Sequence, residues 1–255
     1  MNNYSKYKKD YSYTPAINNA DQQIGVILIH GFGSTTDSML YLATQLSELG
    51  FHVELPTLSG HASDPDDLID VKWENWIDDI QQAWLKIRKR VDKIYLVGIS
   101  MGGTLALNFS TKIPFISGIV LINHALFMNH LKYKFTPFLK SIIADTKDFG
   151  SETTGILDSS VTVINYDKIP LIAIEQLLNL CKDTEEKLFL VKSPVLIFKS
   201  IKDKVIPINV AETTFRKLKT TNKKLVSLYN SHHVATQDFD KELILEEMTK
   251  FFLLN

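Results

Sequence analysis

A serine between glycines is the first candidate for chemistry in this chain. The segment Gly98-Ile99-Ser100-Met101-Gly102 matches the pattern G-x-S-x-G, between an expected strand at 93–97 and an expected helix at 101–109. In that context the serine occupies a tight, strained turn, and the glycines keep side chains from blocking it. Ser100 is therefore a candidate nucleophile. The alternative is a glycine-rich turn in which the serine only caps the helix.

A serine hydroxyl is a weak nucleophile at neutral pH, and it needs a base that is oriented by an acid. Asp203 follows an apolar run at 195–199, and His232-His233 follow the last expected strand. Both positions lie at the carboxyl ends of expected strands, where open α/β sheets build their sites. The chain thus offers a nucleophile, an acid and a base in that order.

Attack on a carbonyl group also requires hydrogen-bond donors for the oxyanion that forms. The segment His30-Gly31-Phe32-Gly33 ends the first apolar strand. We expect the backbone N–H groups of Phe32 and Met101 to be these donors, so the Phe32 side chain is incidental. His30 is expected to hold this loop through its ring nitrogens rather than to transfer protons.

Short β-rich runs alternate with segments of helical periodicity along the chain. Strands are expected at 24–30, 51–55, 93–97, 118–122, 195–199 and 224–229, and helices at 39–49, 73–87, 101–109, 169–180 and 244–252. This alternation predicts an α/β protein with a mostly parallel sheet that is covered on both faces.

One stretch, from Asn123 to Ser193, is longer than a single crossover needs. Residues 169–180 are expected to form the crossover helix. The remaining residues predict a core of residues 1–124 and 166–255, with a cap at 125–165 over the carboxyl edge of the sheet. The apolar side chains of this insertion either pack it onto the body or also line an apolar pocket. The polar N-terminal tail is expected to be a solvated lead-in.

Composition excludes several classes of protein. The 28 Lys and Arg residues balance 29 Asp and Glu residues, which gives no electrostatic case for nucleic acid. The single cysteine, Cys181, and the lack of a Cys/His cluster argue against a disulfide scaffold and a zinc site. No apolar run is long enough to span a membrane, and the first 23 residues have no leader-like core. We expect a cytoplasmic protein, monomer or homodimer, without metal or cofactor.

These stretches together resemble the α/β-hydrolase superfamily and, within it, small bacterial carboxylesterases and monoacylglycerol lipases. The resemblance rests on HGFGST at 30–35, LPTLSGHASDPDDL at 55–68, WENWIDDI at 73–80, VGISMGG at 97–103, SPVLIFKSIKDKVIPINVAE at 193–212 and SHHVATQD at 231–238. It implies an α/β-hydrolase fold with a small lid, and a serine hydrolase that cleaves carboxylic esters through an acyl-enzyme.

Position by position, the resemblance implies that Ser100 is the nucleophile, Asp203 the acid and His233 the base. The chain departs from the pattern at His232, where glycine is usual, so either imidazole could act and His233 is preferred. Asn123 occupies a place where some relatives of the fold carry an alternative acid, and its amide cannot serve as one.

The apolar insertion favours esters of short- to medium-chain acyl groups, monoacylglycerols included. His124, Phe127 and Phe135 are the candidate substrate-binding residues, although a hydrogen-bonded wall position is the plainer interpretation of His124. His61 resembles a structural loop histidine. The alternatives are a thioesterase or a carbon–carbon bond hydrolase with the same residues, or a ligand-binding member without catalysis.

Overall fold

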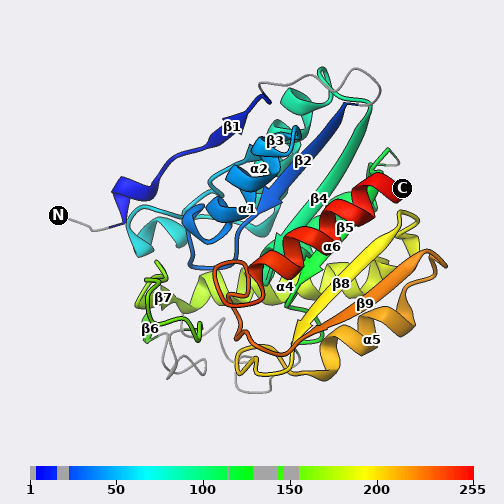
Figure 1. Ribbon diagram of the computed structural model, residues 1–255. Helices are drawn as coiled ribbons and strands as arrows, with labels where there is room; N and C mark the ends of the chain where they lie inside the picture. Colours follow the sequence, from blue (N-terminus) through cyan, green and yellow to red (C-terminus); the bar gives the residue numbers. More distant parts are fainter. Residues whose placement is uncertain (1–3, 16–22, 114, 129–142, 146–154) are drawn as a thin grey trace.

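The fold is built on a seven-stranded sheet. The computed structural model describes residues 4–15, 23–113, 115–128, 143–145 and 155–255. The strand order is β1-β3-β2-β4-β5-β8-β9, and every neighbouring pair is parallel except β1 with β3 (Figure 1). The strands are β1 (Tyr11–Tyr13), β2 (Ile24–Ile29), β3 (His52–Leu55), β4 (Lys93–Ile99), β5 (Gly118–Ile122), β8 (Val195–Ser200) and β9 (Lys223–Leu228). A separate antiparallel pair joins β6 (Ile143–Asp145) to β7 (Lys168–Pro170).

Helices cover both faces of the sheet, as the sequence predicts. They are α1 (Asp37–Glu48), α2 (Trp73–Ile87), α3 (Met101–Ser110), α4 (Leu171–Lys187), α5 (Asn209–Lys217) and α6 (Lys241–Leu254), with 3₁₀ turns at Ser5–Tyr7, Pro65–Leu68 and Leu188–Leu190. The apolar side chains of α1 and α6 share one core with the sheet, and those of α2, α3, α4 and α5 share the other.

The central strands are continuously apolar because both of their faces are buried. In β4, Leu96 belongs to the core under α2 and α3, whereas Tyr95 and Val97 belong to the core under α1 and α6. Because β2, β4, β5 and β8 pair in parallel, their carboxyl ends lie along one edge of the sheet. The mostly parallel α/β fold predicted from the sequence is confirmed.

Two helices differ from the expectation, for a shared physical reason. The crossover helix α4 runs past Leu180 to Lys187, and α5 occupies residues between β8 and β9 for which no helix was predicted. The buried face of late α4 is carried by Cys181 and Thr184, and that of α5 by small side chains and Thr214. Late α4 carries few apolar residues, and α5 is only nine residues long and mostly polar, so neither segment stood out as a helix in the sequence.

The N-terminal segment is not only a solvated lead-in. Tyr11–Tyr13 forms the antiparallel edge strand β1 on β3, and Ser12 Oγ donates a hydrogen bond to Glu54 Oε1 at 2.6 Å. Polar and aromatic residues suit an edge strand. Strands were predicted from apolar runs, and this segment has none, so it was not predicted.

Much of the predicted cap, 125–165, lies outside the described residues, so the division into core and cap stays a prediction. At its start, Ala125 and Leu126 are buried in the core under α3 and α4. Among the described helices, none has the length and apolar character needed to cross a membrane.

Candidate active site

Ser100 lies in a strained turn between β4 and α3. Its φ of 53° and ψ of −122° are unfavourable for a residue with a side chain. The turn is tight: a Cβ atom on Gly98 would lie 2.1 Å from the carbonyl oxygen of Gly102, and one on Gly102 would lie 2.2 Å from that of Ile29. Only glycine fits these two positions, so the G-x-S-x-G pattern has a steric cause here.

The loop after β2 lies directly beside Ser100. A Cβ atom on Gly31 would lie 3.4 Å from Ser100 Cβ and 3.9 Å from Ser100 Oγ. As the first residue of α3, Met101 has an N–H group with no acceptor inside its helix. Within the described part of the chain, neither this N–H nor that of Phe32 donates to a protein acceptor. Both predicted oxyanion donors therefore belong to segments that flank the serine.

His30 holds this loop in place, as expected from the sequence. Its Nε2 accepts a hydrogen bond from the backbone N–H of Leu58 at 3.1 Å, which puts the ring proton on Nδ1. Nδ1 donates to the carbonyl oxygen of Gly31 at 2.9 Å. Burial lowers the pKa of His30 to about 4. The ring is thus neutral, and it ties the loop after β2 to the loop after β3.

His61 is structural, which also confirms the expectation. Its Nδ1 lies 3.1 Å from the carbonyl oxygen of Ser59, and its ring stacks on Tyr166 and contacts the edge of Phe32. Burial, with a further contribution from the nearby His30, lowers the pKa of His61 to about 3. This neutral ring supports the segment that carries the Phe32 N–H.

Asp203 and His233 meet at the carboxyl edge of the sheet. Asp203 Oδ2 lies 2.8 Å from His233 Nδ1, while Oδ1 accepts the backbone N–H groups of Val205 at 2.7 Å and Ile206 at 3.0 Å. Burial raises the pKa of Asp203, but His233 and the two N–H groups outweigh burial and lower it overall. Asp203 is therefore an anion that orients the imidazole.

The structure distinguishes the two adjacent histidines. His233 contacts Asp203, whereas the backbone N–H of His232 donates to Asp238 Oδ2 at 2.8 Å. The Nδ1 atom of His232 is buried and has no hydrogen-bond partner among the described residues. Of the two histidines, His233 is thus the one whose ring contacts a carboxylate.

Asp238 is a residue that sequence reasoning left without a role. Its fully buried carboxylate accepts four backbone N–H groups at 2.8–3.1 Å, from Leu157, Asp158, His232 and Phe239. It therefore joins the segment before β7 to the loop that carries the catalytic candidate His233. The sequence feature that could have pointed to Asp238 is its place at the end of SHHVATQD, one of the stretches that carry the family resemblance.

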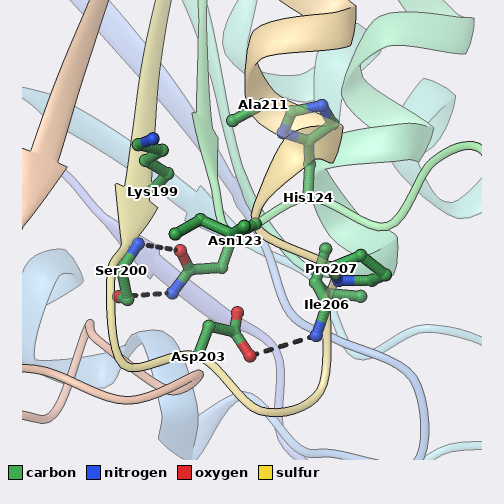
Figure 2. A pocket seen from close by; sticks show the side chains of 9 residues that line it. Asn123, His124, Lys199, Ser200, Asp203, Ile206, Pro207 and Ala211 are labelled. Atoms are coloured by element: carbon green, nitrogen blue, oxygen red, sulfur yellow. Dashed lines mark hydrogen bonds between the residues drawn. The ribbon is translucent and has the colours of Figure 1, made fainter.

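The structure describes two of the three candidate substrate-binding residues, His124 and Phe127. His124 is buried, with Nε2 2.7 Å from Thr214 Oγ1, and it lines a cavity of about 10 Å³ together with Asp203 (Figure 2). That volume is about the room one water molecule needs. The backbone N–H of Phe127 donates to Glu185 at 2.8 Å. Phe135 lies outside the described residues.

Comparisons with known proteins identify the family of this chain. Residues 20–153 match the family described as serine aminopeptidase, S33. The chain is 34% identical over 235 residues to a thermostable monoacylglycerol lipase of Bacillus sp. (strain H-257), covering 90% of both chains. It is 23% identical to a carboxylesterase of Bacillus subtilis (strain 168), covering 89% of this chain and 91% of that protein.

The fold matches a solved structure from work on the metagenome-derived lipolytic enzymes LipS and LipT. The TM-score is 0.89 at 30% identity, and 98% of both chains is covered. The segment that matches the family contains the loop after β2 and the Ser100 turn. The similarity to the Bacillus monoacylglycerol lipase covers 90% of the chain and so includes most of the residues outside that segment. The chain belongs to the serine aminopeptidase S33 family of α/β-hydrolases.

Proposed function

We propose that this protein is a serine hydrolase of carboxylic esters in which Ser100, Asp203 and His233 act as nucleophile, acid and base. The observation that carries the proposal is the 2.8 Å contact of His233 Nδ1 with a buried, anionic Asp203. A carboxylate at Nδ1 keeps the proton there, so Nε2 is the atom that accepts the proton from serine.

The reaction begins when Ser100 Oγ attacks the ester carbonyl carbon and His233 Nε2 takes the hydroxyl proton. The N–H groups of Phe32 and Met101 stabilise the oxyanion, a type of donor worth about 2.7–4 kcal/mol of barrier. The tetrahedral intermediate collapses as the ester C–O bond breaks, and the imidazolium gives its proton to the departing alcohol. Asp203 stabilises the imidazolium throughout.

Water completes the cycle. His233 takes a proton from water as its oxygen attacks the acyl-enzyme, and the second intermediate releases the carboxylic acid while the proton returns to Ser100 Oγ. Each side chain ends in its starting state, so the proposed cycle balances.

We further propose esters of short- to medium-chain acyl groups as substrates, monoacylglycerols among them. Two observations support this class. The relatives at 34% and 23% identity are named as a monoacylglycerol lipase and a carboxylesterase. The segment 125–165 is also rich in apolar residues for a connection between two strands.

The test compares hydrolysis of p-nitrophenyl esters of rising chain length and of 1-monoacylglycerols by the wild type and three variants. Ser100→Ala and His233→Ala should lose activity and labelling by a fluorophosphonate probe, while His232→Ala should keep both. An acyl thioester, a carbon–carbon substrate and an aminoacyl p-nitroanilide complete the panel. Turnover by Ser100→Ala would refute the nucleophile, and preference for one of the last three substrates would refute the ester class.

A further inference from the structure

Asn123 lies where the chain leaves β5, between the turn that carries Asp203 and the loop that carries His233. Its φ of 45° falls in the left-handed region, which asparagine tolerates better than most residues. The residue is buried, and its backbone N–H donates to the carbonyl oxygen of Phe198 in β8 at 3.1 Å. The backbone conformation and the place in the sheet therefore both favour asparagine.

The side-chain amide of Asn123 contacts two different elements at once. Its Oδ1 accepts the backbone N–H of Ser200 at 2.7 Å, and its Nδ2 donates to Ser200 Oγ at 2.9 Å (Figure 2). The same Nδ2 lies 2.8 Å from the carbonyl oxygen of His233 and 3.3 Å from that of His232. Only a group with both a donor and an acceptor can satisfy this set.

Ser200 is the residue from which the acid-bearing turn starts. The backbone N–H of Asp203 donates to the carbonyl oxygen of Ser200 at 3.3 Å, which closes that turn. One amide thus fixes the start of the Asp203 turn and the main chain of His233 itself. The separation of Asp203 Oδ2 from His233 Nδ1 depends on both of these backbone positions.

We propose that Asn123 is a positioning residue that sets the geometry of the Asp203–His233 pair. The inference rests on the proposed function, because it assigns a role relative to those two residues. Asn123 touches neither reacting atoms nor substrate in this role, and acts through the backbone that carries the acid and the base. A displacement of about 1 Å in such a group can lower a rate about 100-fold.

Two variants separate the amide from the backbone conformation. Asn123→Gly removes the amide and accepts a φ of 45° without strain, whereas Asn123→Ala removes the amide and adds strain. The matched control is Asn108→Ala on α3, which also loses a buried amide, one that donates to Asp183 and Thr184 in α4. Asn108 has no part in the proposed chemistry.

The measurement is kcat and KM for the best p-nitrophenyl ester, well below the melting temperature of every variant. Asn123→Gly should lower kcat about 10–100-fold with KM changed about twofold or less. It should also shift the pH dependence of kcat and weaken the far-downfield proton resonance of the His233 Nδ1–H. Asn108→Ala should lower the melting temperature while its kcat and pH dependence stay those of the wild type.

Wild-type kcat, pH dependence and proton resonance in Asn123→Gly would overturn the inference and leave a purely structural amide. If the glycine variant does not fold, Asn123→Ala carries the same test, since it also lacks the amide and adds no carboxylate beside His233. Activity in Ser100→Ala or His233→Ala would instead refute the proposed function, so the two failures are distinguishable.

Discussion

Replacing Ser100 by glycine should make the protein more stable than replacing it by alanine, although both variants lack the nucleophile. Ser100 adopts a φ of 53° and a ψ of −122°, and alanine keeps the Cβ atom that makes this conformation unfavourable. Glycine has no Cβ atom and accepts it freely. The comparison therefore measures the strain that the turn imposes on the candidate nucleophile.

The expected difference follows from two opposing contributions. Relief of an unfavourable backbone conformation is worth about 1–3 kcal/mol, and the greater flexibility of glycine in the unfolded chain costs about 0.5–1 kcal/mol. The free energy gained by relieving the strain exceeds the cost of the flexibility of glycine. Ser100→Gly should therefore be about 0.5–2 kcal/mol more stable than Ser100→Ala. For a chain of this length, that difference raises the melting temperature by about 1–8 °C.

Thermal and denaturant unfolding of the two variants provides the assay. The matched control is Gln82, an exposed residue in the middle of α2, where the backbone is helical and glycine should be about 0.5–1 kcal/mol worse than alanine. The sign of the Gly–Ala difference should thus reverse between positions 100 and 82. The same sign at both positions would show that the turn stores no strain relieved by glycine.

Three further perturbations test the supports of the site. Asp238→Asn should lower the free energy of unfolding by about 2–4 kcal/mol, because an amide nitrogen then faces backbone N–H donors; denaturant melts measure this, and a neutral result would contradict it. Gly98→Ala should cost about 3 kcal/mol or more, since its Cβ meets a carbonyl oxygen at 2.1 Å, and a wild-type melting temperature would count against the steric argument. Acid should destabilise the protein through three buried histidines. Burial lowers the pKa of His30 and His124 to about 4 and that of His61 to about 3, whereas the value in the unfolded chain is 6.5. Below about pH 6 unfolding takes up these three protons, so the free energy of unfolding should fall by up to about 4 kcal/mol per pH unit until about pH 4. Unfolding curves at pH 7, 6 and 5 measure this slope, and a flat profile would refute the neutral burial of these rings.

The sequence predicted the sheet well because its central strands are buried on both faces. An apolar run such as that of β5 leaves little choice of element, and its expected bounds, Gly118–Ile122, are those of the structure. Prediction failed where a buried face uses small or polar side chains, as at Thr214 in α5. It failed also at β1, where pairing with β3 rather than apolar character fixes the strand.

The residues of the site also divide into those that the sequence predicts and those that it does not. Ser100, Asp203 and His233 are recognisable because their chemistry is tied to a local pattern, a glycine-flanked turn or the end of a strand. Asn123 and Asp238 hold the backbone around them through contacts to residues about 80 or more positions away in the chain. No local spacing encodes such contacts. The resemblance gave Asn123 only as a position unable to serve as an acid, which says nothing of what its amide holds.

The environment of each histidine decides its role more sharply than its motif does. His30, His61 and His124 are buried rings whose pKa is lowered, so they remain neutral and hold neighbouring groups in place. His233 differs in two respects, because its Nδ1 faces a carboxylate and its side chain is still 11% exposed. A base must gain a proton during the reaction and must reach the substrate, and burial without a counter-charge prevents the first. Among the described histidines, His233 is the one whose ring contacts a carboxylate, which supports its proposed role as the base.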